Sequence, residues 1–162
     1  MTGIFYGSTT GNTEDLAGQI AQKMGVAATD VYNVANAAAD AVDAYDLLIL
    51  GSSTWGAGEL QDDWYDFLSL LKKKDLSAKS VALFGCGDSS SYPDTFCDAM
   101  GLIKEDLSAT GCTFIGEMDA TGYAETDSLA FADGKVLGLI ADDDEPNLTA
   151  SRLDAWIEII KS

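Results

Sequence analysis

The sequence predicts an α/β fold with a doubly wound parallel sheet that carries helices on both faces. Short apolar runs alternate with longer segments of helical period, and the runs at 47–50 and 81–84 are apolar at every position. Runs of that kind are typical of strands covered on both faces. Alternation of strands and helices favours a parallel sheet with right-handed crossovers. A length of 162 residues is that of one domain.

Each element follows from its local pattern. The first strand is expected at 4–6, and a helix at 12–23 places Leu16, Ile20 and Met24 on one face. The remaining strands and helices are expected at 29–34, 47–50, around 64–71, 81–84, 96–107, 112–115, 136–140 and 149–161. Residues 117–135 are largely polar and without a clear period, so the fifth strand is expected to be interrupted by an insert of roughly 20 residues.

Composition excludes several classes of function. The formal net charge is −18, from 9 Lys and Arg against 27 Asp and Glu. Nucleic acid is a poor partner for such a chain, because its binding requires clustered cations, and an anionic membrane surface is disfavoured for the same reason. A basic protein partner would be attracted by this field. Acidity also serves solubility, and charge alone does not separate these two roles.

The titratable residues narrow the chemistry further. The chain has no histidine, which excludes imidazole acid–base catalysis, Ser-His-Asp triads and imidazole metal ligands. Cys86, Cys97 and Cys112 form no C-x-x-C pair and are expected to be free thiols in a reducing cytosol. The N-terminal segment resembles no signal peptide, and no apolar run reaches the ~20 residues of a membrane span, which predicts a cytoplasmic protein. No metal site is expected, since the acidic run at 142–145 lacks EF-hand spacing.

The chemistry should lie in three loops, at 7–13, 53–62 and 85–94. A doubly wound sheet binds its ligand beyond the carboxyl ends of its strands, and these loops follow the first, third and fourth strands. The first loop holds four hydroxyls, a glycine and the start of a helix, which together can bind a phosphate without a cation. A P-loop would require Gly-Lys-Ser/Thr, and a dinucleotide-binding fingerprint would require G-x-G-x-x-G. Neither motif is present in this loop.

The first loop resembles the phosphate loop of the flavodoxin family, whose form is Thr/Ser-x-Thr-Gly-x-Thr. A response-regulator receiver domain shares the fold but needs an acidic pair after the first strand, where this chain has Tyr6-Gly7. The resemblance covers the whole chain, and the sequence is similar to the long-chain subclass of the family. It implies a five-stranded sheet in the order 2-1-3-4-5. The phosphate-binding residues that it implies are Ser8, Thr9, Thr10, Gly11, Asn12 and Thr13.

The second and third loops carry the aromatic residues expected at a flat ring. Trp55 stands among Thr and Gly residues at a strand end, where an aromatic can stack on a ring, and Trp64 is assigned to the helix core. The third loop resembles the family's Gly-x-Gly-Asp-x-x-x-Tyr, with Ser89 where many relatives have Gln. The ring-binding residues that the resemblance implies are Ser53, Thr54, Trp55, Gly56, Ala57, Gly58, Cys86, Gly87, Asp88 and Tyr92.

The resemblance implies one non-covalent FMN and a low-potential carrier of single electrons, not an enzyme. In such a carrier FMN supplies the redox chemistry, and the protein supplies binding and electrostatics. The expected partners are basic surfaces of redox proteins, with no nucleic acid and no membrane insertion, and the chain is expected to be a monomer. The alternative is an FMN-dependent NAD(P)H or quinone reductase on the same fold, which would need a substrate pocket over the ring.

Overall fold

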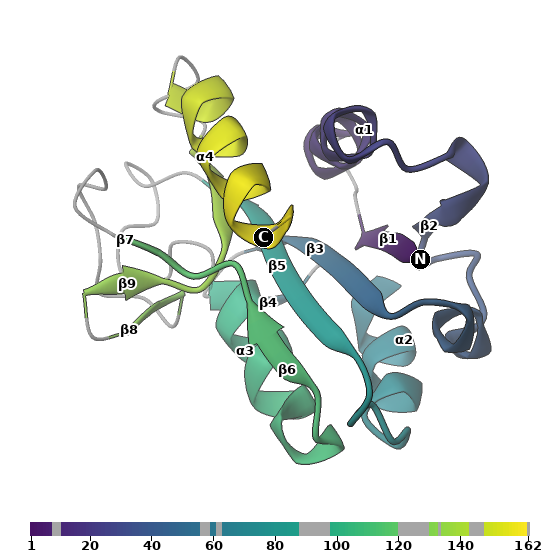
Figure 1. Cartoon of the computed structure of the whole chain (residues 1–162). Coiled ribbons are helices and arrows are strands. Elements are labelled where there is room, and N and C mark those ends of the chain that lie inside the picture. Colours follow the sequence, from purple (N-terminus) through teal and green to yellow (C-terminus); the bar gives the residue numbers. More distant parts are fainter. Residues whose placement is uncertain are drawn as a thin grey trace.

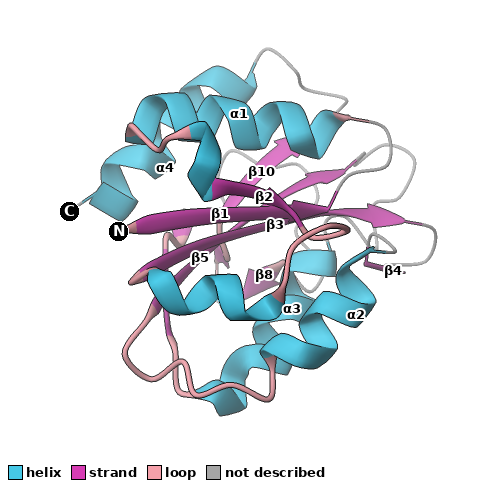
Figure 2. Cartoon of the chain, turned by 90° about the vertical axis from the view of Figure 1, so that its right-hand side faces the viewer, coloured by secondary structure: helices cyan, strands magenta, loops and turns pink. Residues whose placement is uncertain are grey.

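The structure is a computed structural model that describes residues 1–7, 11–55, 59–60, 63–87, 98–119, 130–132, 134–142 and 148–161. A twisted sheet forms its centre, with helices on both sides (Figures 1 and 2). Its main strands are β1 (Thr2–Gly7), β2 (Val31–Asn33), β3 (Leu47–Trp55), β5 (Ser80–Gly87) and β10 (Leu139–Asp142). They are parallel and lie in the order β10-β5-β3-β1-β2. In chain order this is 2-1-3-4-5, which confirms the predicted fold.

The helices divide between the two faces of the sheet. Figure 2 shows α1 (Asn12–Met24) and α4 (Thr149–Lys161) on one side. On the other side lie α2 (Asp63–Leu71) and α3 (Asp98–Leu107). The strand predicted at 29–34 is shorter, because residues 28–30 form a turn of 3₁₀ helix before β2 begins.

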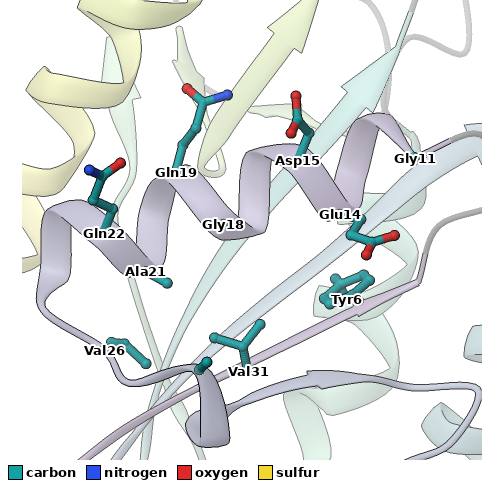
Figure 3. Close-up of a pocket in the computed structure, with 11 residues that line it drawn as sticks. Tyr6, Gly11, Glu14, Asp15, Gly18, Gln19, Ala21, Gln22, Val26 and Val31 are labelled. Carbon is teal, nitrogen blue, oxygen red and sulfur yellow. The ribbon is translucent and has the colours of Figure 1, made fainter.

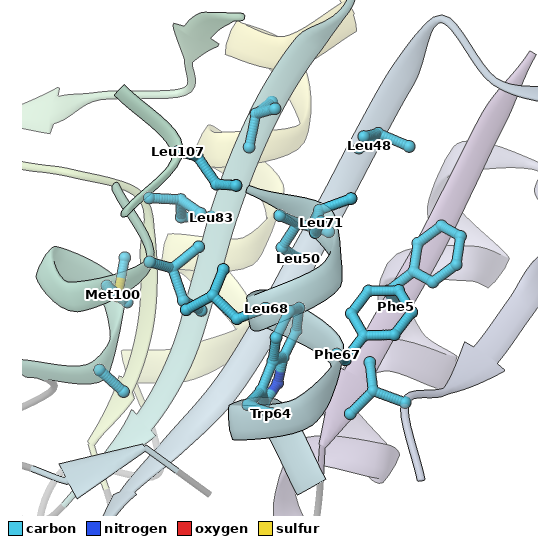
Figure 4. Close-up of a cluster of buried hydrophobic side chains, with 14 of the residues drawn as sticks. Phe5, Leu48, Leu50, Trp64, Phe67, Leu68, Leu71, Leu83, Met100 and Leu107 are labelled. Carbon is cyan, nitrogen blue, oxygen red and sulfur yellow. The ribbon is translucent and has the colours of Figure 1, made fainter. Parts of the chain in front are cut away.

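Alternation of side chains along the strands builds two hydrophobic cores. On β3, Leu48 and Leu50 point toward α2 and α3, and Ile49 points toward α1 and α4. Burial on both faces explains the continuous apolar runs in the sequence. Trp64 is fully buried in the α2 core, as predicted, and its Nε1 donates a hydrogen bond of 2.7 Å to the Gly51 carbonyl (Figure 4).

The fifth strand is split, as predicted, but its second half begins later than expected. The two parts of the fifth strand are β6 (Thr113–Ile115) and β10, and both pair with β5. β6 pairs with the first half of β5, and β10 pairs with its second half. Between them lie three short antiparallel strands, β7 (Met118–Asp119), β8 (Phe131–Ala132) and β9 (Lys135–Val136), in the order β7-β9-β8. The prediction of one strand over 136–140 is therefore wrong at its start, since Val136 pairs with Met118 and Phe131. Strands of two residues are too short to produce a period in the sequence.

Gly138 permits the chain to return from this small sheet to β10. A Cβ built at this position would lie 1.8 Å from the carbonyl oxygen of Leu83 on β5. Backbone packs directly against backbone here, so only glycine fits.

No helix among the described residues is long and apolar enough to cross a bilayer.

We expect Gly138→Ala to lower the free energy of unfolding by at least ~1–3 kcal/mol, the usual cost of overpacking, because the methyl group meets a backbone carbonyl. Urea unfolding measures this. The matched control is Gly18→Ala in α1, where an added Cβ meets no described atom within 4 Å. Alanine should raise stability there by about 0.5–1 kcal/mol through its helix propensity. Equal stability of Gly138→Ala and the original chain would contradict the close approach to Leu83.

Candidate functional site

Three strand ends converge at one edge of the sheet. Gly7 of β1 is in register with Ser52 of β3, and Ser52 is in register with Gly85 of β5. The next pair is Ser53 with Cys86. The chain therefore leaves β1, β3 and β5 at neighbouring points, which is the arrangement that the sequence predicted for the three loops.

The end of β3 differs from the prediction of a loop over 53–62. The strand continues through Trp55 and pairs in antiparallel fashion with β4 (Glu59–Leu60). Thr54 is in register with Leu60, and Trp55 with Glu59. β3 and β4 are therefore antiparallel partners that lie close together in the sequence. The backbone of Trp55 is held by this pairing at the same edge as the other strand ends.

The start of α1 lies at this edge. Gly11 adopts a left-handed conformation with φ of 94°, which glycine reaches without strain. The Asp15 amide donates to the Gly11 carbonyl over 2.9 Å and closes the first helical hydrogen bond. Amides before Asp15 have no acceptor within the helix, because the first turn of any helix leaves its N–H groups unpaired. A helix start of this kind favours an anionic ligand.

Thr13 supplies the most informative polar group of the site. Its residue is 1% exposed. Within the part of the chain that the structure describes, its hydroxyl has no hydrogen-bond partner. A buried hydroxyl without a partner costs about 1–3 kcal/mol, so such groups are usually paired. Thr13 therefore has the burial and the unused hydrogen-bonding capacity of a residue that binds a ligand group.

Cys86 marks the third loop at the end of β5. It is buried and lies between Ser53 of β3 and Ala141 of β10. The backbone of Gly87 pairs with Asp142 in the same ladder. Both residues thus stand at the edge where the resemblance placed them.

Several predicted residues lie outside the described part of the chain. These are Ser8, Thr9, Thr10, Gly56, Ala57, Gly58, Asp88, Ser89 and Tyr92, as well as Cys97. The side chains of Asn12, Ser53, Thr54 and Trp55 are also not described. For the predicted site residues that are described, the structure shows that the backbone of all three loops lies at one edge of the sheet.

Ser52 belongs to this edge, although the sequence interpretation did not select it. It is 1% exposed and stands in register with both Gly7 and Gly85. The signal in the sequence is the change from a wholly apolar run to Gly51-Ser52-Ser53.

Comparison with known proteins identifies the family. A family model described as flavodoxin matches residues 4–156. The chain belongs to the flavodoxin family. Flavodoxin 1 of Escherichia coli K12 is 43% identical over 162 residues, which cover 99% of this chain and 92% of the relative. The flavodoxin of Picosynechococcus is 40% identical, covering 98% of this chain and 95% of its own.

Solved structures of the family share the fold. A flavodoxin of Fusobacterium nucleatum, described as bound to flavin mononucleotide, superposes with a TM-score of 0.88 at 27% identity. The match covers 99% of this chain and 96% of that chain. An oxidised flavodoxin 1 of Bacillus cereus has a TM-score of 0.69 at 26% identity, over 99% and 97% of the two chains.

We expect Thr13→Val to raise the unfolding free energy of the ligand-free chain by about 1 kcal/mol, because valine has the same shape without an unpaired hydroxyl. Urea unfolding of the flavin-free protein measures this. The matched control is Thr110→Val, since Thr110 is also buried but its hydroxyl donates to the Leu107 carbonyl over 2.6 Å. That control should lose about 1 kcal/mol. A loss of stability in Thr13→Val as large as in the control would show that the Thr13 hydroxyl has a structural partner.

Proposed function

We propose that this protein binds one FMN at the edge formed by β1, β3 and β5 and carries single electrons between redox proteins. The observation that carries this proposal is the buried Thr13 hydroxyl at the start of α1, which has no hydrogen-bond partner among the described residues. A related flavodoxin described as bound to flavin mononucleotide, with the same fold, supports the choice of ligand. Such a cofactor, when bound, supplies a ring that accepts electrons one at a time.

The phosphate group fits the first turn of α1. We assign its binding to the amides of 11–13, to the Thr13 hydroxyl and to the hydroxyls of Ser8, Thr9 and Thr10. None of these groups is a cation, and the first turn of α1 adds the carboxylates of Glu14 and Asp15. The phosphate would therefore keep its charge in an acidic surrounding, which supports selection of a ligand by neutral donors and helix geometry.

The ring is assigned to the two neighbouring loops. In this proposal Trp55 and Tyr92 stack on its two faces, with Ser53, Thr54 and 56–58 along the inner side. The pyrimidine edge is assigned to Cys86, Gly87 and Asp88. The pairing of Ser53 with Cys86 supports this arrangement, because it brings the second and third loops within one strand spacing of each other, about 4.7–4.9 Å.

The acidic site would make each added electron harder to accept. Two like unit charges roughly 4 Å apart repel by about 4 kcal/mol at an effective dielectric constant of about 20. Carboxylates near the ring and a charged phosphate would both oppose a second negative charge. Aromatic cover adds to this effect by excluding water from the ring. These effects together favour a strongly reducing second electron.

Acidic residues stand in the first turns of three helices, at the edge of the sheet where the proposed site lies. The first turns of α1, α2 and α3 carry Glu14, Asp15, Asp63, Asp66 and Asp98, at the edge where the proposed site lies. The last turns at the opposite edge mix both signs, since Lys104 stands with Glu105 and Asp106 in α3, and Lys161 follows Glu158 in α4. A basic partner would be attracted to the site edge first, which supports docking close to the flavin.

We further propose that residues 1–162 form a single domain of the long-chain subclass that acts as a monomer in the cytoplasm. The continuous sheet, with both helical layers packed on it, supports one domain. The thiol of Cys112, which forms no disulfide among the described residues, agrees with a reducing compartment.

Substitutions at the proposed contacts should weaken FMN binding. Thr13→Val should weaken it by roughly tenfold, since a hydrogen bond to a charged group contributes about 1.5–3 kcal/mol. Trp55→Ala and Tyr92→Ala should each cost about 1–3 kcal/mol of stacking. Quenching of flavin fluorescence on titration of the flavin-free chain measures the FMN dissociation constant of each of the three variants.

Two controls make this test specific. Thr110 lies in the turn after α3 and not in the first turn of α1, so Thr110→Val should bind FMN with unchanged affinity. The same is expected of Tyr65→Ala, on the exposed side of α2. If the Thr13 and aromatic variants bind FMN as tightly as the original chain, the assigned contacts are wrong. If FAD binds in place of FMN, the proposed cofactor is wrong.

Electron transfer through the loaded chain tests the function itself. With a basic NADPH-oxidising flavoprotein reductase and cytochrome c, the loaded chain should speed cytochrome reduction, and it should not oxidise NADPH without the reductase. The rate should fall steeply with added salt, because the field of the acidic edge is screened over about 8 Å at physiological ionic strength. Direct oxidation of NADPH by the chain alone would favour the reductase alternative, and a rate indifferent to salt would remove the docking role of the acidic edge.

A further inference from the structure

A groove of about 750 Å³ runs along α1, beside the edge strand β2. Four of its lining residues share one face of the helix, at spacings of four, seven and eight residues, namely Glu14, Gly18, Ala21 and Gln22. Tyr6, Val26 and Val31 line it from the sheet side, as Figure 3 shows. A groove of this size is within the usual range for ligand sites. The proposed FMN site uses only the end of the groove at the start of α1, where Gly11 lines it.

Nothing among the described residues requires glycine at position 18. It lies in the middle of α1, where glycine costs about 0.5–1 kcal/mol relative to alanine. A Cβ built on it meets no described atom within 4 Å, and its backbone does not have a positive φ. Gly138, in contrast, is required by a close backbone contact. A glycine that the fold does not require, facing an open groove, indicates that something else approaches the helix backbone there.

The groove is acidic at one end and apolar at the other. Glu14 lies beside Tyr6 at one end, and the Tyr6 hydroxyl hydrogen-bonds the Glu14 carboxylate. Burial, together with this carboxylate, raises the pKa of Tyr6, so the phenol stays a neutral donor. Ala21 and Val31 supply apolar surface further along. Among the described residues that line the groove, none is Lys or Arg.

We propose that this groove binds a lysine or arginine side chain of a redox partner, with its aliphatic stem along Gly18 and Ala21 and its charge at Glu14. Long cationic side chains place their stems on apolar surface and their charge toward polar groups. The absence of a Cβ at Gly18 lets the stem reach the helix backbone. A second copy of the chain fits poorly, because two chains of net charge −18 repel each other.

This inference rests on the proposed carrier function and adds a specific anchor to it. The groove and the start of α1 share Gly11 and the first helical turn. A partner held by one cation in the groove would therefore be seated beside the edge where FMN is proposed to bind. General attraction to the acidic edge would bring the partner close, and the groove would fix its position.

The test fills the groove without disturbing the proposed flavin contacts. The FMN-loaded, ¹⁵N-labelled chain is titrated with a hexa-arginine peptide, and amide shifts are followed by NMR. We expect saturable shifts at Gly18, Gln22 and Val31, and a loss of affinity of roughly tenfold in Gly18→Leu. Gly18→Ala should show a smaller loss although its melting temperature rises, which separates blocked binding from impaired folding. The matched control is Ser69→Leu, which adds the same side chain on the exposed face of α2.

Each other outcome overturns the inference. Equal affinity of Gly18→Leu and the original chain would remove the groove as a binding site. Shifts spread over the first turns of α2 and α3 would indicate general attraction to acidic residues. Dimers in sedimentation that disappear in Gly18→Leu would make a second copy the occupant. FMN content and electron transfer to cytochrome c are measured on the same samples, so loss of the proposed function is seen separately from loss of the groove.

Discussion

The pairing of β3 with β1 on one side and β5 on the other holds the rest of the molecule in place. These three strands stop at neighbouring points, and the register of Ser52 with Gly7 and Gly85 brings three loops to one edge. Helices cover both faces of the sheet, so apolar side chains pack closely against the strands on either side. The bond from the Trp64 indole to the Gly51 carbonyl ties α2 to the centre of the sheet, near the point where β3 pairs with β4. A slip in this register would separate all three loops together.

From this arrangement follow both the polarity and the ligand preference of the site edge. Right-handed crossovers start the helices at the carboxyl ends of the strands. The first amides of α1, which have no acceptor within the helix, and the buried Thr13 hydroxyl therefore lie at this edge. The same topology places the acidic first turns of α1, α2 and α3 at the site. Neutral donors in an acidic surrounding suit a phosphate-bearing group whose charge is to be kept. Under the proposed function, the fold would supply binding and a repulsive field in one place.

Much of this was open to prediction, and the exceptions have physical causes. Strands buried on both faces leave continuous apolar runs, so β3 and β5 were found, and α4 was predicted at its observed residues. The small sheet of β7, β8 and β9 was missed, because two-residue strands show no period. Whether the Thr13 hydroxyl lacks a partner depends on distances between segments, which no sequence pattern carries. The groove was missed for the same reason, since a helical glycine is informative only once the space around it is known.

The central claim is that the strand edge holds FMN in a surrounding that resists a second electron. An anaerobic spectroelectrochemical titration of the loaded chain measures this directly, because it counts electrons in each reduction step. The account predicts two separate one-electron waves, with the second at a much lower potential than the second step of free FMN. A single two-electron wave near the potential of free FMN would contradict it, and a two-electron reductase would then be the better description of the protein.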